Sequence, residues 1–506
     1  MKSITKADLV KFANRFYGEN YVVAYKHIGE DPNRHKVEKP KITPIVVNRD
    51  VESEFVTEFK KMESSAMTPK FLDFEKDISK AKLSSGIPFN YVHNKYNNTF
   101  TLTYIYDIGT FHDKEMALAF QYLPLLGTDK YTAEELQKEM YALGLSFNVS
   151  AGDKRSSVSL SGLEESLEEG MKLLEHIISS VEPDQQKYDE FVNDILKKRM
   201  DNKRNKRTIL FRGLVSRAKF GENSPFTYNF SEIELKSMDV NKLASKVHSM
   251  TGYDHRVFYY GSKEMDEAKK IVEKHHRTEE QLAQVGDPVE FPERDINEGE
   301  IYFADYDMVQ AEIILVAKDE KFNKELLPYS LVFNEYFGSG LSSIVFQEIR
   351  EQKALAYSAY SVFRAPEEKD DSHYIYAYVG TQADKLGDAI KEIKRLLNDM
   401  PEVEEQFQGS KESAIKKLET DWITKASIYW SFESAKRRGL DYDVRKDNYD
   451  VVKGMEMEDL RNFFNDHIKG KDYALCVIGS KDNVDFDVLG EYGTVKELSL
   501  EEIFNY

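Results

Sequence analysis

The sequence contains one short unit three times, and this repeat restricts the possible folds more than any other feature. Each copy opens as an amphipathic helix, continues as a β-rich run and ends at a glycine. The copies occupy residues 5–29, 238–261 and 457–479. Their shared leucines and closing glycines lie at similar distances, Leu9 to Gly29, Leu243 to Gly261 and Leu460 to Gly479. Internal similarity at a nearly fixed spacing indicates homologous supersecondary units.

A longer body occurs twice, and each time it precedes a copy of the short unit. Residues 120–177 and 333–397 both read as helix, glycine turn, helix, two strands, glycine and helix. The strands alternate apolar and polar residues, as at Val158-Ser159-Leu160, which is typical of a sheet with one covered face. We therefore predict an α+β fold with two homologous domains, each a mainly antiparallel sheet with helices packed on one face.

The first short unit has no body before it. The simplest account is that residues 1–29 are the terminal helix and strand of a preceding domain whose body lies upstream. Four further segments are expected: an extended, proline-containing linker at 30–81, a domain at 82–284, a linker at 285–300 and a domain at 301–506. Near the start of the first of these domains, residues 89–93 and 99–107 are predicted to form a β-hairpin around a polar turn.

Composition limits the function classes. The 506 residues suggest about three domains. The net charge of −19 argues against a nucleic-acid surface, because phosphate binding relies on clustered Lys and Arg. We interpret the one basic run, residues 197–207, as a solvated helix face. The single cysteine, Cys476, lies in an apolar run and is expected to be a buried strand residue, so no intrachain disulfide is possible.

Targeting signals are not evident. No apolar run approaches the roughly 18 residues that a membrane helix needs. The start of the chain reads as a capped amphipathic helix and not as a signal peptide. We expect a soluble protein in the cytoplasm or, if a longer precursor is exported, in the periplasm.

Residues 333–357 contain the strongest candidate site. They read as helix, glycine turn, helix and then a strand that begins near Leu355. Gly338 and Gly340 bracket the turn, and glycine allows positive φ or a close backbone approach. Ser342 or Ser343 can cap the next helix.

Arg350 on the last turn of that helix and Tyr357 seven residues later are the two residues that we single out. From the residues alone, the simpler interpretation is structural: Arg350 pairs with Glu348 or Glu351, and Tyr357 packs in the sheet. A phosphate-binding loop at residues 338–343 is disfavoured, since the turn lacks the lysine of a P-loop and the spacing of a dinucleotide-binding turn.

The order of elements resembles the pitrilysin/insulinase family of zinc metallopeptidases over nearly the full chain. The resemblance is strongest at residues 338–357, where the family pattern is a glycine-rich turn, Ser, Arg and then Leu-x-Tyr. It also shows at Gly127-Thr128, which is followed by a helix at 133–143 and the Gly144 turn. The resemblance implies two homologous α+β domains that form one half of a clamshell, the third and fourth domains of a four-domain enzyme.

The zinc-binding H-x-x-E-H motif of that family is absent. Counted back from Gly127-Thr128, its positions hold Leu118, Gln121 and Tyr122, which cannot supply a zinc ligand set and a general base. The adjacent His275 and His276 would face about 100° apart on a helix and are not expected to form a metal site. We expect no cofactor in this chain, and zinc in an upstream or partner half.

By the resemblance, Arg350 and Tyr357 reach across to the zinc site when the clamshell closes. A tyrosine hydroxyl can donate to the oxyanion of a tetrahedral intermediate, and arginine offers a fork of donors for a carbonyl or carboxylate. Gly338, Gly340 and Ser342 are expected to support this pair. The chain is then the substrate-binding half of a metalloendopeptidase that hydrolyses peptides in a closed chamber, and it is inactive alone. Its expected partners are a peptide and an N-terminal zinc-bearing half.

Two alternatives stay open. The chain can be a separate zinc-free subunit that pairs with an H-x-x-E-H subunit, with its first helix and strand docked into that partner. It can also be a non-catalytic scaffold of the same fold, in which case loss of Arg350 or Tyr357 has no consequence. In either case an edge strand could take a peptide as an added strand, although the sequence does not say which strand.

Overall fold

The computed structural model describes residues 4–26, 53–62 and 67–506. The chain divides into two compact units, Met1–Ala66 and Met67–Tyr506. In the smaller unit, helix α1 (Lys6–Phe16) begins at a capping box formed by Thr5 and Asp8, and helix α2 (Glu54–Lys61) follows. Residues 17–26 form no strand. Most of the predicted linker lies outside the described residues.

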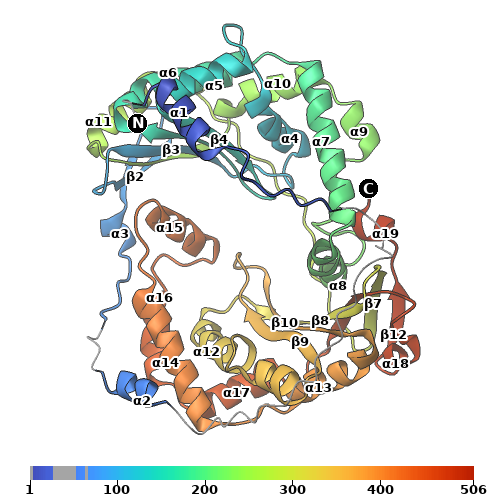
Figure 1. The fold of residues 1–506 in the computed structure, drawn as a ribbon. Coiled ribbons are helices and arrows are strands. Elements are labelled where there is room, and N and C mark those ends of the chain that lie inside the picture. Colours follow the sequence, from blue (N-terminus) through green and yellow to red (C-terminus); the bar gives the residue numbers. More distant parts are fainter. Residues whose placement is uncertain (1–3, 27–52, 63–66) are drawn as a thin grey trace. The chain divides into compact units, whose positions relative to one another are not determined.

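The first body of the larger unit, residues 74–275, is built on a six-stranded mixed sheet (Figure 1). The strand order is β1-β2-β6-β3-β5-β4, in which β2 and β6 are parallel and all other neighbours antiparallel. The strands are β1 (Ser79–Lys82), β2 (Pro88–His93), β3 (Thr99–Tyr106), β4 (Leu145–Ala151), β5 (Ser156–Leu163) and β6 (His255–Gly261). The sheet thus begins inside the range predicted as linker.

The helices of the first body are α3 (Phe74–Asp77), α4 (Lys114–Tyr122), α5 (Ala133–Ala142), α6 (Leu167–Ser180), α7 (Gln185–Lys203), α8 (Val215–Phe220), α9 (Glu232–Lys236), α10 (Val240–His248) and α11 (Met265–His275). A π-helix, η3 (Thr208–Leu214), leads directly into α8, and short 3-10 turns are η1 (Leu123–Leu125), η2 (Glu164–Ser166) and η4 (Met250–Gly252).

The predicted hairpin of residues 89–93 and 99–107 is wrong. Strands β2 and β3 form at these places, but β6 lies between them, parallel to β2 and antiparallel to β3. The physical reason is the apolar character of β6, in which Val257, Phe258 and Tyr259 are all fully buried. A strand that is apolar on both sides is most stable in the middle of a sheet whose two faces are covered.

The second body, residues 300–504, repeats this architecture. Its sheet has the order β12-β7-β11-β8-β10-β9, with β11 parallel to β7 and antiparallel to β8. The strands are β7 (Glu300–Asp305), β8 (Gln310–Lys321), β9 (Ala356–Arg364), β10 (Ser372–Gln382), β11 (Ala474–Gly479) and β12 (Thr494–Glu497). The α+β prediction with two homologous sheets is confirmed, and both sheets are mixed.

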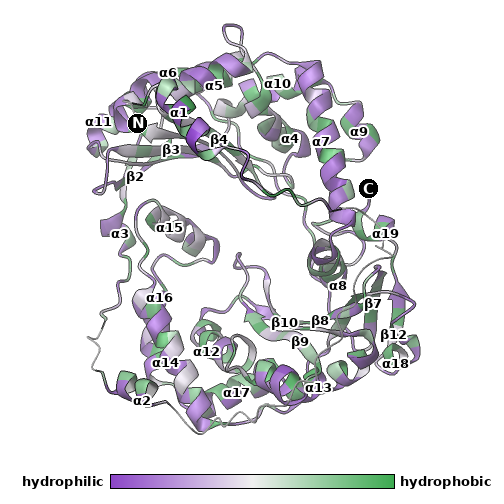
Figure 2. Cartoon of the chain, viewed as in Figure 1, coloured by the Kyte–Doolittle hydropathy of each residue, from purple (hydrophilic) through white to green (hydrophobic). Residues whose placement is uncertain are grey.

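The helices of the second body are α12 (Leu327–Phe333), α13 (Leu386–Asn398), α14 (Glu404–Thr420), α15 (Ser427–Arg437), α16 (Arg445–Gly454), α17 (Met457–His467), α18 (Phe486–Gly490) and α19 (Leu500–Phe504). Two π-helices, η6 (Asn334–Gly338) and η7 (Phe346–Gln352), and two 3-10 turns, η5 (Lys324–Leu326) and η8 (Ala383–Lys385), complete it. Figure 2 shows frequent hydrophobic residues on the strands and a largely hydrophilic α7.

The two later copies of the short unit take the same place in their bodies. The second copy supplies α10 and β6, and the third supplies α17 and β11. In each case the strand lies between a parallel and an antiparallel neighbour. The helix contributes buried residues to the core of its own body, such as Leu243 in α10 and Leu460 in α17. The repeat is therefore a helix that covers the sheet and a strand that fills its centre.

Each sheet also receives a helix from the other body on its second face. Helix α15 packs on the first sheet, where the Tyr429 and Phe258 rings stack with centroids 4.1 Å apart. The π-helix η3 buries Ile209, Leu210 and Leu214 against the second sheet. Helices therefore cover part of the second face of each sheet, in addition to the one face that was predicted. The exchange of α15 and η3 also holds the two bodies together.

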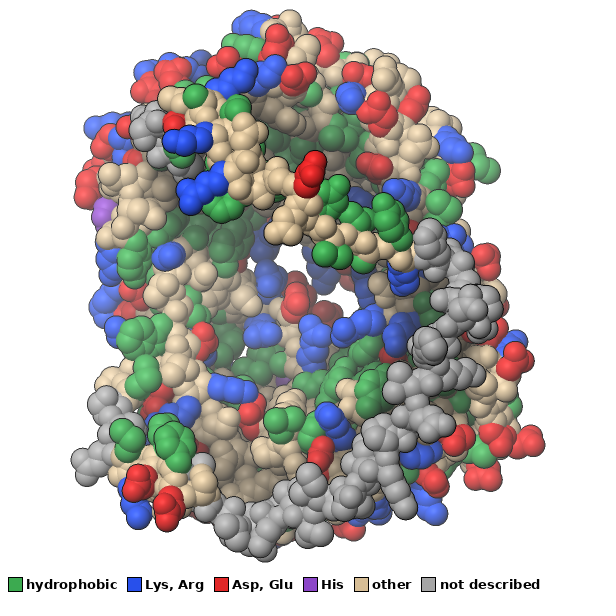
Figure 3. Space-filling model, viewed as in Figure 1, with side chains coloured by type: hydrophobic (Ala, Val, Ile, Leu, Met, Phe, Trp, Pro, Cys, Tyr) green, Lys and Arg blue, Asp and Glu red, His purple; other side chains and the backbone are tan. Residues whose placement is uncertain are grey.

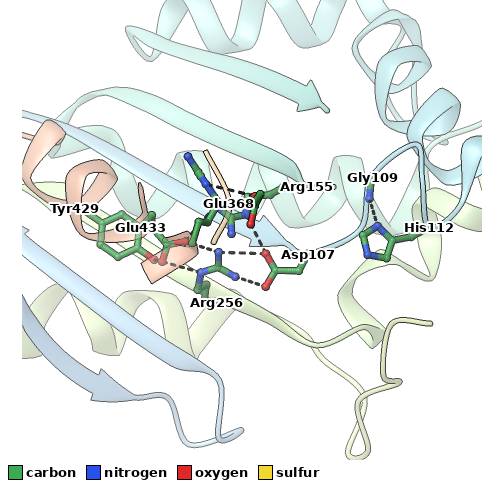
Figure 4. Close-up of polar contacts among 9 residues, drawn as sticks. Asp107, Gly109, His112, Arg155, Arg256, Glu368, Tyr429 and Glu433 are labelled. Carbon is green, nitrogen blue, oxygen red and sulfur yellow. Dashed lines mark hydrogen bonds and ion pairs between the residues drawn. The ribbon is translucent and has the colours of Figure 1, made fainter. Parts of the chain in front are cut away.

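A partly buried charged network lies between α15 and the first sheet (Figure 4). Arg256 on β6 donates to Glu433 at 2.6 Å and to Asp107 at 2.8 Å. Arg155 contacts the same two carboxylates at 3.3 and 2.9 Å, and the Tyr429 hydroxyl donates to Glu433 at 2.9 Å. Burial alone would raise the pKa of Glu433, but the hydrogen bonds and charge of Arg256 hold it below its ordinary value.

The basic run at residues 197–207 is not only a solvated helix face. The guanidinium of Arg199 lies 4.5 Å from the ring centroid of Tyr506, and Lys206 pairs with Glu312 at 2.6 Å. The run therefore fastens the first body to the second. On the surface in Figure 3, basic and acidic side chains are interspersed. Across the parts of the chain that the structure describes, no helix is long and apolar enough to span a membrane.

Candidate functional site

Residues 333–357 depart from regular helix geometry on both sides of the predicted glycine turn. The segments around the turn are wound as π-helices, η6 before it and η7 after it, and β9 begins at Ala356. Short π-helical segments occur frequently at functional sites.

The two glycines of the turn have different physical roles. A Cβ atom on Gly338 would lie 1.7 Å from the carbonyl oxygen of Ser361, so only glycine allows η6 to approach β9 so closely. Gly340 has a φ of +91°, in the left-handed region. The Ser343 hydroxyl accepts from the Phe346 N–H at 3.4 Å, whereas Ser342 only offers its carbonyl to a side chain of α14.

Tyr357 is the extra residue of a β-bulge. The residues on either side of it pair with consecutive residues of β10, so Tyr357 itself has no partner in the register. A bulge turns a side chain toward a different direction from the one that regular alternation gives. Its hydroxyl donates to Gln310 Oε1 at 2.9 Å and lies over Gly380, where a Cβ would be 3.2 Å away. The side chain remains 45% exposed and can meet an external ligand.

Two more ionisable residues, Tyr378 and Glu312, lie beside Gly380. The Tyr378 hydroxyl also lies over Gly380, within 2.8 Å of the position of a Cβ there. Glu312 on β8 stands opposite Gly380 in the register, is 3% exposed, and pairs with Lys206 at 2.6 Å. Burial first, and then the charge of Glu312, raises the pKa of Tyr378 well above its ordinary value.

The sequence reasoning missed these neighbours of Tyr357. They come from β8, from β10 and from a segment of the first body, all far from Tyr357 in the chain. The one local signal was Gly380, a glycine inside a strand pattern, which often marks a bulge or a close approach.

The side chain of Arg350 has a separate set of contacts from that of Tyr357. Its side chain is 44% exposed, its Nε lies 3.6 Å from a Glu351 carboxylate oxygen, and its guanidinium lies 4.8 Å from the ring centroid of Phe346. Within the described residues, none of its contacts reaches Tyr357. The described structure thus does not bring the two predicted site residues into contact.

The positions counted for a zinc motif lie on α4. Leu118 and Tyr122 are buried, and Gln121 is exposed. The Tyr122 hydroxyl donates to the carbonyl of Asp184, and burial raises its pKa to about 12. In this chain α4 is a packing helix.

The adjacent histidines are hydrogen-bonded structural groups. His275 lies 3.1 Å from Glu168, and the buried His276 lies 2.8 Å from both His255 and Glu175. Among residues 4–26, 53–62 and 67–506, no group of three or more His, Cys, Asp or Glu side chains is placed to hold a metal ion.

A pocket of about 740 Å³ lies where the β4–β5 turn meets the β9–β10 loop. It is lined by acidic and basic side chains, among them Asp153, Glu368, Asp371 and Lys219. Burial raises the pKa of the three carboxyl groups and lowers that of Lys219.

Residues 255–436 match the family model described as the peptidase M16 inactive domain. This stretch is therefore similar to the inactive domain of M16 peptidases. The match confirms the predicted relation to the pitrilysin/insulinase family, in a sequence without the zinc motif. A comparison of the sequence with curated proteins gave no match.

Several solved structures share the fold. The peptidase M16 inactive domain from Pseudomonas fluorescens is 16% identical, with a TM-score of 0.61 over 81% of this chain and 99% of that one. The periplasmic protease PqqL from Escherichia coli is 12% identical, with a TM-score of 0.63 over 95% of this chain and 51% of that one. The ferredoxin protease FusC, solved as a mutant in complex with Arabidopsis ferredoxin, is 12% identical, with a TM-score of 0.63 over 94% of this chain and 51% of that one. The chain thus spans about half of the two proteases, and at these identities the likeness concerns the fold.

Proposed function

We propose that this chain is the substrate-binding half of a zinc metalloendopeptidase and that it acts on peptides together with a zinc-bearing half. The observation that carries the proposal is the position of Tyr357. This residue of the β-bulge is 45% exposed, and its hydroxyl lies over Gly380 and donates to the neutral amide of Gln310. The M16 match and the half-length likeness to two proteases support the reaction class.

The hydrogen bond of Tyr357 to Gln310 is weak enough for the hydroxyl to exchange that acceptor for a substrate. Its acceptor, the Gln310 amide, is neutral, and such a bond contributes about 0.5–1.5 kcal/mol. The hydroxyl can therefore turn to a peptide carbonyl or to the oxyanion of a tetrahedral intermediate, where donors contribute most to the rate.

Arg350 suits recognition of the same peptide at a second point. Its solvent-exposed ion pair with Glu351 is of a kind worth about 0–1 kcal/mol, so a substrate carboxylate or carbonyl can compete for the guanidinium. FusC was solved with a ferredoxin, and a small folded protein of that kind is a substrate class to test beside short peptides.

The zinc of this proposed enzyme lies in the other half, since α4 offers no ligand set. The first short unit is the proposed contact with that half. On α1 the side chains of Leu9, Phe12 and Phe16 are more than half exposed, as are Tyr21 and Val22 after it. The other two copies of the unit place such a helix on a sheet and such a strand inside it. We propose that residues 4–26 do the same for a body of the zinc-bearing half.

Mixing tests the proposal most directly. Peptidase activity and bound zinc are measured for this chain alone, for a separately expressed H-x-x-E-H half, and for the two together. We expect no activity and no zinc with this chain alone, and activity in the mixture. Activity of this chain alone, or inactivity of all three samples, would contradict the proposal, and the second result would favour a scaffold.

The substitution Tyr357→Phe tests the role of the hydroxyl. We expect turnover in the mixture to fall at least tenfold, about 1.4 kcal/mol, with little change in KM, because the donor acts mainly in the transition state. The control is Tyr141→Phe, which removes a hydroxyl from an 87% exposed tyrosine on α5. Equal turnover for Tyr357→Phe and its control would exclude the oxyanion role.

A further inference from the structure

We infer that Lys206 of the first body is a positioning residue for Tyr357 of the second body and acts by neutralising Glu312. The inference concerns the side chains around Gly380, and only its catalytic consequence rests on the proposed function.

Glu312 places a buried carboxylate under the tyrosine site. It is 3% exposed and stands opposite Gly380, over which the hydroxyls of Tyr357 and Tyr378 lie. A carboxylate accepts hydrogen bonds about twice as strongly as a neutral amide. Without a counter-charge, Glu312 would compete with Gln310 for the hydroxyl of Tyr357.

Lys206 supplies that counter-charge at 2.6 Å. The hydrogen bond to Glu312 raises the pKa of Lys206, partly opposed by burial, and the nearby Tyr357 and Tyr306 add to the rise. The lysine is therefore charged at neutral pH, and the Glu312 carboxylate is occupied. The hydroxyl of Tyr357 keeps its weaker, exchangeable acceptor.

The segment that carries Lys206 is fixed on both sides. The Tyr306 hydroxyl donates to the carbonyl of Arg204 at 2.8 Å. The Asn205 side chain accepts from the N–H groups of Arg207 and Thr208 at 3.0 and 3.2 Å. The π-helix η3 that follows is buried on the second sheet, so Lys206 is held in place by the exchange between the two bodies.

The charge of Glu312 gives a specific test. The full chain is prepared with 3-fluorotyrosine at position 357, and its 19F resonance is compared among Lys206→Met, Lys206→Arg, Glu312→Gln and the double variant Lys206→Met/Glu312→Gln. We expect Lys206→Met to shift the resonance and Lys206→Arg to leave it nearly unchanged. In the double variant the resonance should return toward its original position, because the unpaired carboxylate is gone.

The matched control is Lys203→Met, which removes a lysine of the same basic run that pairs with the exposed Glu501. It should leave the resonance unchanged. An unchanged resonance in Lys206→Met would overturn the inference. A shift that persists in the double variant would also overturn it, because Lys206 would then act through packing and not through charge.

The same variants separate this inference from the proposed function. In an active mixture with the zinc-bearing half, Lys206→Met should lower kcat at least fivefold with little change in KM, and the double variant should recover to within about twofold. If the resonances behave as expected but no mixture is active, the inference holds and the proposed function fails. If kcat falls and the double variant does not recover, the inference fails and the proposed function stands.

Discussion

Tyr357 owes its position to residues that carry no reactive group. Gly380 leaves the space in which its hydroxyl lies, and Gln310 holds that hydroxyl without a charge. Gly338 lets η6 approach the strand that carries Tyr357. The position of Tyr357 therefore depends on side-chain atoms that are missing at the two glycines as much as on those that are present.

The close approach at Gly338 predicts a large loss of stability on Gly338→Ala. The new Cβ would meet a backbone oxygen 1.7 Å away, which cannot move without shifting β9. We expect the free energy of unfolding, measured by urea denaturation, to fall by about 3 kcal/mol or more.

Gly409→Ala is the matched control, because Gly409 lies inside α14 with open space around it. There the added methyl group should raise stability by about 0.5–1 kcal/mol. Similar stabilities for Gly338→Ala and the original chain would show that η6 does not need this contact.

At the scale of elements, the stretch from η6 to β9, which contains both candidate residues, concentrates irregular geometry. Both of its helices are π-helical, and Ala354, between Arg350 and Tyr357, has a φ of +49°. A left-handed conformation costs a non-glycine residue roughly 1–2 kcal/mol. Such local cost is typical of segments whose conformation serves a site.

The strain at Ala354 predicts that Ala354→Gly raises stability. Glycine relieves the steric cost, and its greater freedom in the unfolded chain offsets part of the gain, so we expect a net increase of about 0.5 kcal/mol. The melting temperature of the two chains measures it, with Ala414→Gly inside α14 as a control that should lower stability. A clear loss with Ala354→Gly would mean that the methyl group makes a contact worth more than the strain.

At the scale of the whole larger unit, the two bodies are held by exchanged helices and by ion pairs across them. In the charged network at the contact of α15 with the first sheet, Arg256 and Glu433 are largely buried and Asp107 is exposed. Removing one member of a buried pair leaves an uncompensated charge, which typically costs about 3–5 kcal/mol. We therefore expect the stability of the chain to fall both when a member of the network is substituted and when the pH is lowered.

For Glu433→Gln we expect a loss of about 3 kcal/mol or more at neutral pH, against no change for Glu405→Gln on the exposed side of α14. Arg256 holds the pKa of Glu433 and Asp107 below the ordinary values, against the effect of burial. Their stabilisation is thus fully present above the ordinary carboxyl pKa and is lost as the pH falls through the lower, folded-state values.

Melting temperatures between pH 3 and pH 8 check this expectation. The original chain should be nearly constant from pH 6 to 8 and fall below about pH 4. Glu433→Gln should fall less steeply in acid, since one of the titrating groups is gone. An equally steep fall in both chains would assign the acid sensitivity to other carboxyl groups.

The sequence by itself determined the features that depend on neighbours along the chain. The helix of each short unit, the capping box of Thr5 and Asp8, and the helix at residues 133–143 follow from local periodicity and caps. The turn at Gly338 and Gly340 was predicted because glycine allows backbone conformations and close approaches that other residues do not. The repeat indicated two homologous sheets, and the sequence itself shows that the H-x-x-E-H motif is absent.

Only the tertiary structure decided which strands and side chains meet. The insertion of β6 between β2 and β3 depends on burial of an apolar strand on both faces, and no local turn encodes it. The bulge at Tyr357 depends on the register with β10, and the pairing of Lys206 with Glu312 depends on the exchange of helices between the bodies. Contacts between distant segments form because the whole core lowers its free energy together, so a reading of neighbouring residues cannot supply them.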